Sequence, residues 1–344
     1  MTTVAAVCTD VGGWRAVRPA VDVLTPRGHT VIHFHGGPAH QHATAEGYES
    51  HPVSLDSPYE AARQITASGA AALLVGTSTR PVIERWLVRE MRGTIPSVGV
   101  LDASLFAAHR FRPAFLELPD RLACPDPETA EALGQGGAPR ERLAVTGNPA
   151  IEALVPSATP RRPASSQLDV LFVSQPVELT GEERSLFLID ERETLAHVIQ
   201  ALGMVRTHRG GSVRIRIRRH PIEEPWRCMP LAEGIAVVDD PHADRVVSAL
   251  AADLVVGISS SLLTEASVLG RPAIAHLPGA HWRRELVYPA THRVVRTETV
   301  EQLIAAIDER IDGRAETMDV RAHVGAARAV AQLVLDAAAR AMRG

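Results

Sequence analysis

Short apolar runs alternate with segments of helical spacing along the first 150 residues. Residues 4–8 and 30–34 have the apolar character of buried strands, and residues 14–24 between them carry apolar side chains at helical intervals. This order predicts a βαβ unit, in which a helix connects two parallel strands. The same alternation predicts helices at 60–68, 81–91 and 127–133 and strands at 71–75, 97–101, 121–124 and 143–146.

A second alternating region follows a polar stretch. Residues 156–167, PSATPRRPASSQ, are rich in Pro, Ser and Arg without apolar periodicity, which is typical of an exposed linker. The helix expected at the end of the chain, over 320–342, is rich in Ala, and we expect it to pack back on the first domain. The elements expected after the linker are strands at 169–173, 212–217, 234–238 and 253–256, a helix, turn and strand over 266–275, and helices at 191–207, 300–311 and 320–342.

These elements predict an α/β fold with two domains. A chain of 344 residues with 45% hydrophobic content exceeds the usual size of a single core. An aromatic content of only 4% implies cores of small aliphatic residues, which suit parallel sheets covered by helices. We therefore expect two Rossmann-like, doubly wound parallel-sheet domains that face a central cleft: residues 1–155, with about six strands, and residues 168–344.

Charge and cysteine content narrow the range of partners. Lys+Arg 36 against Asp+Glu 40 gives a net charge of −4, which argues against nucleic acid as a partner. Cys8, Cys124 and Cys228 lie far apart, which predicts neither a disulfide framework nor a zinc site. The N-terminus has no signal-peptide pattern, and no segment reaches the roughly eighteen consecutive apolar residues of a membrane span. We therefore expect a soluble, cytoplasmic protein without a transmembrane segment.

The strongest chemical signal is the run ADLVVGISSSLLTEASVLGRPAI at residues 252–274, where an apolar strand leads into serines that open a helix. A helix N-terminus has unpaired N–H groups and a partial positive charge, which together favour a phosphate. Ser259, Ser260 and Ser261 add hydroxyl donors, and Glu265 can accept hydrogen bonds from ribose hydroxyls. The alternative is that these side chains only cap the helix.

Three segments together resemble the GT-B superfamily, which includes bacterial glycosyltransferases and the hydrolysing UDP-GlcNAc 2-epimerases. They are the serine run with its Glu265 and the Gly-Arg-Pro at 270–272, the sequence VTGNP at 145–149, and RRHP at 218–221. The resemblance covers most of the chain in motif order. It implies a GT-B fold with a nucleotide-sugar site, but it does not define one reaction.

Carried over to individual residues, the resemblance assigns the nucleotide to the second domain. Donors and cations at such a site stabilise the negative charge that develops on a departing nucleoside diphosphate. By contrast, Arg214 and Arg216 alternate with apolar residues and are interpreted as the solvated face of a strand. The residues assigned to diphosphate, ribose and the facing phosphate contacts are Ser260, Ser261, Glu265, His220 and Arg218 or Arg219.

Two further loops are assigned to the cleft. Ser174 and Gln175 end a strand ahead of a proline, and the resemblance implies that they contact phosphate or base; a plain strand-ending turn is the alternative. Asp10, Gly12 and Gly13 follow the first strand and resemble the glycine loop of GT-B first domains, where the backbone approaches the acceptor or donor. The sequence contains neither the GxGxxG fingerprint nor a Walker A lysine motif.

Asp102 is the candidate catalytic residue of the first domain. It lies at the carboxyl end of a predicted strand, in a segment similar to one where the epimerases have a catalytic Glu. A carboxylate there can deprotonate an acceptor hydroxyl or amine if burial raises its pKa. His109 and Arg110 follow closely and are candidates to join it. An Asx turn is the alternative for Asp102.

Two departures from the epimerase pattern favour transfer of a sugar. An acidic residue of the epimerases is replaced here by Gly-Thr-Ser at 76–78, and a further Glu is replaced within His-Arg-Phe at 109–111. The chain therefore lacks two of the three carboxylates that the resemblance assigns to epimerisation. Segments 101–111, 118–120 and 174–176 are more similar to poorly characterised epimerase-like proteins of surface-polysaccharide and natural-product clusters.

Four histidines, His33, His35, His40 and His42, lie within ten residues. The first two share one face of a strand, and we place the other two in a Gly/Pro loop without a nearby acidic partner. We therefore predict that they do not bind a metal. An acceptor-facing loop and plain surface remain the alternatives for this segment.

We predict a metal-independent GT-B glycosyltransferase that moves a sugar from a nucleoside-diphosphate donor to a saccharide or small-molecule acceptor in surface-polysaccharide or natural-product biosynthesis. The nucleotide sugar is a co-substrate, and we expect no other cofactor. Three alternatives stay open: a hydrolysing NDP-sugar 2-epimerase-like enzyme, a phosphotransferase that uses a CDP-polyol, and a non-catalytic GT-B protein. The sequence leaves open the base and sugar of the donor, the acceptor and a homodimeric state.

Overall fold

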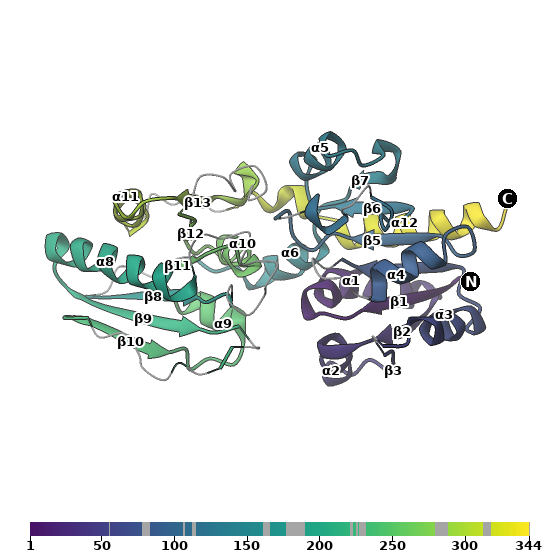
Figure 1. The fold of residues 1–344 in the computed structure, drawn as a ribbon, viewed down its shortest axis with the longest axis horizontal. Coiled ribbons are helices and arrows are strands. Elements are labelled where there is room, and N and C mark those ends of the chain that lie inside the picture. The colour runs from purple at the N-terminus through teal and green to yellow at the C-terminus, as the bar shows by residue number, and fades with distance from the viewer. Residues whose placement is uncertain are drawn as a thin grey trace. The chain divides into compact units, whose positions relative to one another are not determined.

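The computed structural model describes residues 1–54, 56–77, 83–105, 107–111, 115–160, 166–176, 190–220, 223–224, 226, 232–278, 288–311 and 318–343. The chain divides into two compact units (Figure 1). Unit 1 comprises Met1–Ala153 and Val320–Gly344, and unit 2 comprises Leu154–Asp319. Within the linker expected at 156–167, residues 161–165 lie outside the described part of the chain.

Unit 1 is built on a sheet of seven parallel strands. They are β1 (Thr3–Cys8), β2 (Thr30–His35), β3 (Ser50–Pro52), β4 (Ala72–Gly76), β5 (Ser97–Val100), β6 (Arg121–Cys124) and β7 (Leu143–Val145). Their order in the sheet is β3-β2-β1-β4-β5-β6-β7, so the strands run outward from β1 in both directions. This is the doubly wound arrangement. The apolar side chains of β1 are fully buried, as expected where helices cover both faces.

Helices cover both faces of the unit 1 sheet. They are α1 (Val11–Leu24), α2 (Gly37–Ala45), α3 (Pro58–Ala67), α4 (Ile83–Glu90), α5 (Pro127–Gln135), α6 (Pro149–Leu154) and α12 (Ala326–Ala341). Helices α1, α2 and α12 bury one apolar cluster around Trp14. Helices α3 and α4 bury a second cluster on the opposite face. Single 3-10 turns complete the unit: η1 (Thr25–Arg27), η2 (His109–Phe111), η3 (Arg140–Arg142) and η7 (Val320–His323).

Unit 2 repeats this plan with six parallel strands. They are β8 (Gln167–Val173), β9 (Ser212–Arg218), β10 (Ile235–Asp239), β11 (Leu254–Gly257), β12 (Ala273–His276) and β13 (Val294–Thr297). Their order is β10-β9-β8-β11-β12-β13. Numbered within the unit, this order is 3-2-1-4-5-6, which is the order of a dinucleotide-binding Rossmann sheet.

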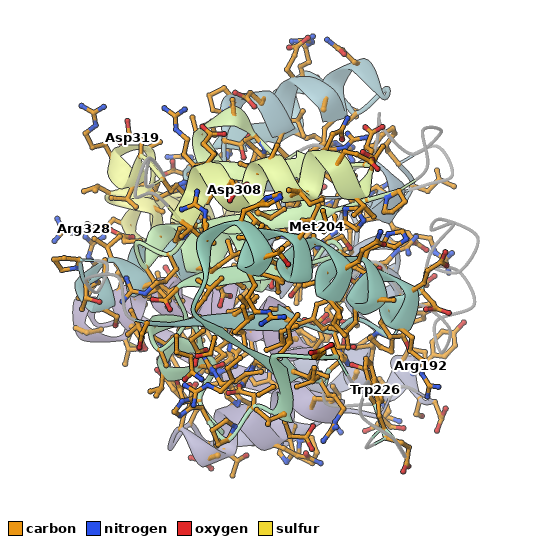
Figure 2. All side chains as sticks on the ribbon, turned by 90° about the vertical axis from the view of Figure 1, so that its left-hand side faces the viewer. Arg192, Met204, Trp226, Asp308, Asp319 and Arg328 are labelled. Carbon is orange, nitrogen blue, oxygen red and sulfur yellow. The ribbon has the colours of Figure 1, made fainter. Side chains whose placement is uncertain are left out.

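The helices of unit 2 also divide between the two faces of its sheet. Those among the described residues are α8 (Glu191–Arg209), α9 (Arg245–Leu250), α10 (Ser261–Val268) and α11 (Val300–Ile311), with the 3-10 turns η4 (Val155–Ser157) and η6 (Ala290–His292). Helices α8 and α11 lie side by side over one apolar cluster (Figure 2). At the start of α8, the Arg192 guanidinium lies 5.7 Å from the centre of the Trp226 ring (Figure 2). Helices α9 and α10 pack against each other, and α10 contacts β11 and β12.

The alternating strands and helices predicted from apolar periodicity are confirmed in both units, but some short elements were not predicted: β3 and α2 near the N-terminus, α6 at the end of the first region, and α9 and β13 in unit 2. Strand β3 has only three residues, one of them proline, and so shows no apolar alternation. Residues 37–45 form helix α2 and not a Gly/Pro loop, because Pro38 lies in the first turn, where its missing N–H costs no hydrogen bond. His40 and His42 therefore lie on a helix.

Two further predictions are wrong in detail. The helix expected over 320–342 is interrupted, because Gly325 adopts a left-handed conformation with φ of 84° between η7 and α12. Arg216, interpreted as a solvated strand residue, is 2% exposed. Helix α9 covers its face of β9, and Arg216 Nη2 donates a hydrogen bond to the carbonyl oxygen of Ser248 in α9 at 3.0 Å.

Candidate functional site

The strand order of unit 2 creates a topological switch point between β8 and β11. In open α/β sheets, ligands bind outside the carboxyl ends of the strands at such a point. Ser174 and Gln175 directly follow β8, and Ser259 and Ser260 follow β11. The structure therefore brings together two loops that the sequence assigned separately to the nucleotide.

Gln175 joins these two loops. Its Oε1 accepts hydrogen bonds from the backbone N–H of Ser259 at 3.1 Å and from Ser259 Oγ at 2.9 Å. The neighbouring Ser174 is buried and donates from Oγ to Glu223 Oε1 at 2.7 Å. These contacts fix the shape of the sheet edge where a ligand would bind.

Helix α10 begins at the same edge. Ser260 is its N-cap, and Ser260 Oγ accepts a hydrogen bond from the N–H of Leu262 at 3.2 Å, as the capping alternative predicts. Ser261 is the first helical residue and is exposed. Because first-turn N–H groups point out of the N-terminal end of a helix, α10 presents its partial positive charge at the switch point. Capping by Ser260 and anion binding by the remaining groups are compatible.

Glu265, one turn into α10, pairs with a residue that the sequence analysis did not identify. Its Oε2 lies 2.7 Å from Nε of Arg245, the first residue of α9. Burial raises the pKa of the Glu265 carboxyl, and the charge of Arg245 acts in the opposite direction. No sequence motif pointed to Arg245, because its partner lies in a different helix.

The basic residues predicted to face the phosphates are held within unit 2. Arg218 donates hydrogen bonds to Asp240 Oδ2 and to the carbonyl oxygens of residues 242 and 243, each at 2.9 Å. Arg219 Nη1 lies 2.5 Å from Asp239 Oδ1. His220 is exposed just beyond the carboxyl end of β9, the strand next to β8. Arg218 and Arg219 thus have acidic partners. His220 lies at the ligand-binding edge of the sheet, and its backbone N–H donates to Glu223 Oε2 at 2.5 Å.

Unit 1 has its own switch point, between β1 and β4. Asp10 follows β1 and is the N-cap of α1, where its Oδ1 accepts a hydrogen bond from the N–H of Gly13 at 2.6 Å. A Cβ atom added at Gly76, the last residue of β4, would lie 2.8 Å from Gly13 Cα. Glycine is therefore required for α1 to begin this close to β4, as in the glycine loop that the sequence resembles.

Asp102 lies at the same edge, just beyond β5. Arg110 Nη1 donates to Asp102 Oδ1, and it also donates to the carbonyl oxygen of Thr77 at 3.0 Å and to Thr77 Oγ1 at 3.1 Å. Arg110 is buried, so it fixes the carboxylate of Asp102 against the loop that follows β4. His109 lies beside Arg110 in η2, but its side chain is outside the described part of the chain.

Two carboxylates lie close to Gly12, in the first turn of α1. A Cβ atom added at Gly12 would lie 2.9 Å from Asp102 Oδ2 and 3.3 Å from Asp10 Oδ1. The two oxygens are therefore no more than about 6 Å apart, a separation within which their charges interact. Three residues that the sequence named as candidates, Asp10, Gly12 and Asp102, thus form one cluster within unit 1.

Glu84 adds a carboxyl group that the sequence analysis missed. It comes from the first turn of α4, is 2% exposed, and accepts hydrogen bonds from Thr9 N–H at 2.6 Å and from Thr9 Oγ1 at 2.8 Å. Burial, reinforced by the charge of Asp10, raises the pKa of Glu84 to about 8. A signal was present: Glu84 shares the helical face of Leu87 and Val88, where a charged residue is unexpected.

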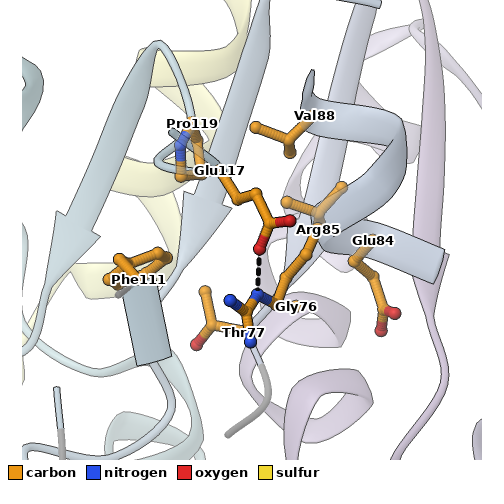
Figure 3. Close-up of a pocket in the computed structure, with 9 residues that line it drawn as sticks. Gly76, Thr77, Glu84, Arg85, Val88, Phe111, Glu117 and Pro119 are labelled. Atoms are coloured by element: carbon orange, nitrogen blue, oxygen red, sulfur yellow. Dashed lines mark hydrogen bonds and ion pairs between the residues drawn. The ribbon is translucent and has the colours of Figure 1, made fainter. Parts of the chain in front are cut away.

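A small cavity lies next to this carboxyl group (Figure 3). Its volume of about 10 Å³ is enough for a single water molecule and far too small for a nucleotide sugar. Arg85 and Glu117 close one side, with Arg85 Nε donating to Glu117 Oε2 at 2.5 Å (Figure 3). We therefore regard this cavity as part of the packing between α4 and the sheet, and not as a substrate site.

The first two histidines of the histidine-rich segment lie in the core. His35 is fully buried, His33 is 8% exposed, and both rings pack beside Trp14. Cys8 N–H donates to His35 Nδ1 at 3.1 Å, and His35 Nε2 lies 3.2 Å from His33 Nδ1. The interpretation of these two residues as an acceptor-facing loop or plain surface is wrong, because β2 turns this face toward α1.

Comparison with known proteins identifies the fold. No protein-family model matches the sequence, and no curated protein matches it. UDP-GlcNAc 2-epimerase from Neisseria meningitidis, in a structure bound to UDP-GlcNAc, is 13% identical with a TM-score of 0.67 and covers 97% of this chain and 100% of its own. MurG from Acinetobacter baumannii is 13% identical with a TM-score of 0.58 over 98% of this chain and 100% of its own. The glycotransferase of kitacinnamycin is 15% identical with a TM-score of 0.57 over 99% and 98%.

These likenesses confirm the GT-B fold that the sequence motifs predicted. The match extends over nearly the whole chain and over nearly the whole of each similar structure, so both Rossmann-like units are included. The same fold serves epimerases and glycosyltransferases, and the fold alone does not distinguish the two reactions. In the described part of the chain, no helix combines the length and the apolar character that crossing a membrane requires.

Proposed function

We propose that the protein is a GT-B-type glycosyltransferase that moves a sugar from a nucleoside-diphosphate donor to a hydroxyl or amine acceptor, without a metal ion or another cofactor. Structures of the same fold that carry UDP-GlcNAc or UDP support a nucleotide sugar as the donor class. The acceptor is a saccharide or small molecule of surface-polysaccharide or natural-product biosynthesis.

One observation carries the donor site. Gln175 after β8 and Ser259 after β11 are hydrogen-bonded across the switch point, next to the N-terminus of α10. A diphosphate bound there receives backbone N–H groups and the hydroxyl of Ser261, while Glu265 accepts from the ribose. Because these donors are fixed before the reaction, they stabilise the charge that develops on the leaving nucleoside diphosphate.

Asp102 is the proposed general base in unit 1. Its Oδ1 is bound by Arg110, while Oδ2 lies on the Gly12 side, where glycine leaves the approach open. A carboxylate held in this way can accept the proton of an acceptor hydroxyl as the new glycosidic bond forms. His109 is a second candidate for proton transfer, on the basis of its position beside Arg110 in the chain.

Release of nucleoside diphosphate, measured with and without acceptors, tests the transferase proposal. UDP-GlcNAc is the first donor to use, followed by GDP-, CDP- and dTDP-sugars, with mono- and disaccharides as acceptor probes. A transferase releases diphosphate slowly with donor alone and faster with an acceptor, and Asp102→Asn abolishes the acceptor-dependent part. Full release without an acceptor contradicts transfer as the principal reaction.

A hydrolysing epimerase-like activity is the second candidate, and it too rests on a specific observation. Such a reaction needs a second acid or base beside Asp102, and Asp10 also lies next to Gly12. This candidate predicts turnover of donor alone and loss of that turnover in Asp10→Asn as well as in Asp102→Asn. A transferase depends on Asp10 only through the capping of α1.

A further inference from the structure

The ion pair between Arg245 and Glu265 is nearly buried, although it lies close to the ligand edge of unit 2. The side chains of Arg245 and Glu265 are 16% and 13% exposed. Arg245 begins α9 and Glu265 lies in the second turn of α10, and the two helices pack against each other. The pair therefore sets the position of the carboxylate relative to the N-terminus of α10.

Arg245 has spare hydrogen-bonding capacity. Its Nη1 is buried, and among the described residues it has no hydrogen-bond partner. The preceding Asp244 is occupied as the N-cap of α9, accepting from the N–H groups of Val246 and Val247 at 2.7 and 2.9 Å. A buried guanidinium donor without a partner is unfavourable unless a ligand or water completes it.

The groups that face Glu265 come from several elements. Burial raises the pKa of its carboxyl, Arg245 and then Arg218 of β9 oppose that rise, and Asp244 adds to it. From η6, His292 lies beside Thr264 Oγ1, with Nδ1 at 3.3 Å. Because Arg218 is already bound to Asp240, Arg245 is the principal charge that opposes the rise in the pKa of Glu265.

We propose that Arg245 is the positioning residue of the nucleotide site: its ion pair with Glu265 holds the carboxylate in place to accept a hydrogen bond from the ribose. The spare N–H of Arg245 then donates to the ribose oxygen whose hydroxyl donates to Glu265. This inference rests on the proposed function, since it assumes that a nucleotide binds at α10. It adds to that function a residue that no motif assigned and a defined pH dependence.

The test is a pH profile of nucleotide binding in three proteins. Calorimetric titrations with UDP, GDP, CDP, dTDP and ADP at pH 6, 7 and 8 are made on the wild type, Arg245→Gln and Arg245→Lys. The ionisation of the diphosphate is common to all three proteins, so the comparison is with the wild-type profile. In Arg245→Gln the pKa of the carboxyl rises further, so Kd should increase more steeply toward low pH than in the wild type, by up to about tenfold for each pH unit below the new pKa. Arg245→Lys restores the wild-type profile because it restores the charge.

Two further measurements separate positioning from a structural role. Glu265→Gln, which cannot ionise, should bind weakly at every pH and without the steeper slope expected of Arg245→Gln. The carbon-13 titration of the Glu265 carboxyl in the free protein, assigned with this variant, should move to higher pH in Arg245→Gln and return in Arg245→Lys. A merely structural role for Arg245 would lower stability without changing either pH profile.

The outcomes are distinct. If the wild type binds a diphosphate and Arg245→Gln binds it with the same affinity and pH profile, the inference is overturned and the proposed function stands. An unmoved Glu265 titration in Arg245→Gln overturns the inference without any ligand. If the wild type binds none of the five diphosphates, the proposed function fails and this inference fails with it.

Discussion

Glu84 Oε1 accepts a hydrogen bond from the backbone N–H of Thr9 at 2.6 Å, although the two residues are 75 positions apart in the chain. The contact ties α4 to the end of β1, one residue before the Asp10 that caps α1. It therefore supports the loop on which Asp10 and Gly12 are carried. The buried carboxyl group has its pKa raised from 4.5 to about 8, which makes the contact sensitive to pH.

The first prediction concerns stability against pH. Between pH 4.5 and 8 the folded protein keeps the Glu84 proton that the unfolded chain loses, so folding stability falls as pH rises through this window and levels off above it. The slope from this group is at most roughly 1.4 kcal/mol per pH unit. Glu84→Gln removes that slope while retaining an oxygen for Thr9. Urea unfolding of both proteins at pH 5, 6, 7 and 8 measures the slope of stability against pH.

Glu90→Gln is the matched control, because Glu90 lies on the same helix but is exposed. We expect its pH dependence to equal that of the wild type. Parallel curves for wild type and Glu84→Gln would show that Glu84 does not hold a proton in this range.

The second prediction compares two arginines of β9 that share one partner. Arg216 is buried and bridges Asp169 Oδ1 at 2.6 Å and Asp240 Oδ1 at 2.8 Å. Arg216→Met leaves these carboxylates without their central cation, and we expect a loss of about 3–5 kcal/mol in the free energy of unfolding. The side chain of Arg214 also binds Asp169 but is 44% exposed, so Arg214→Met should lose less than about 1 kcal/mol.

Denaturant titration of the two variants at neutral pH checks this difference. Similar losses for Arg214→Met and Arg216→Met would mean that burial does not govern the network, contrary to the placement of Arg216 beneath α9.

The third prediction concerns Gly12. A methyl group there would come within 2.9 Å of Asp102 Oδ2, so the carboxylate must move. We expect Gly12→Ala to reduce turnover of the donor sugar by roughly tenfold to a hundredfold, because small displacements of catalytic groups are costly, while the protein stays folded. Gly203→Ala is the control: a Cβ added there meets nothing within 4 Å, and alanine inside α8 should stabilise by about 0.5–1 kcal/mol.

Steady-state kinetics and thermal melting of the two glycine variants distinguish the roles. Normal turnover in Gly12→Ala would remove Asp102 Oδ2 from the reacting position that we assign to it.

The fourth prediction concerns acid. Burial lowers the pKa of His33 to about 4 and that of His35 to about 3, so both are neutral in the folded protein. Below pH 6.5 these two imidazoles bind protons in the unfolded chain but stay neutral in the folded protein. The free energy of unfolding therefore falls as pH drops. His35→Gln should flatten this loss, since glutamine can accept from Cys8 without titrating. His208→Gln is the control: His208 is exposed, so this substitution should leave the acid-induced loss of stability unchanged.

Thermal melting between pH 4 and 7 checks the histidine prediction. An acid-induced loss that is the same in His35→Gln and in the wild type would place its origin elsewhere.

The sequence predicted most of the fold because apolar periodicity is a local property. The apolar run of β1 and the helical spacing of α1 determined their element types without any tertiary information. Strand β3 was missed because three edge residues with a proline carry no period. The break at Gly325 was missed because a single glycine in an Ala-rich helix is compatible with either a helix or a cap.

The site was predictable only in part, for a related reason. Ser260 and Asp102 could be named as candidates because they follow apolar strands, at the edge where ligands collect. The partners that give these groups their chemistry come from distant segments: Arg245 for Glu265, and Glu84 for the loop before Asp10. Neither pairing has a sequence signature of its own, because side-chain contacts between elements depend on the packing of the whole unit.

The central claim is that a nucleoside diphosphate binds at the N-terminus of α10, and a thermal-shift panel tests it most directly. UDP, GDP, CDP, dTDP and ADP are compared on the wild type, on Ser261→Ala and Glu265→Ala, and on Asp126→Ala, a control that removes the N-cap of α5 in unit 1. We predict that one diphosphate raises the melting temperature of the wild type and of Asp126→Ala but not of the two unit 2 variants. No shift with any diphosphate, or an equal shift in all four proteins, would contradict the claim.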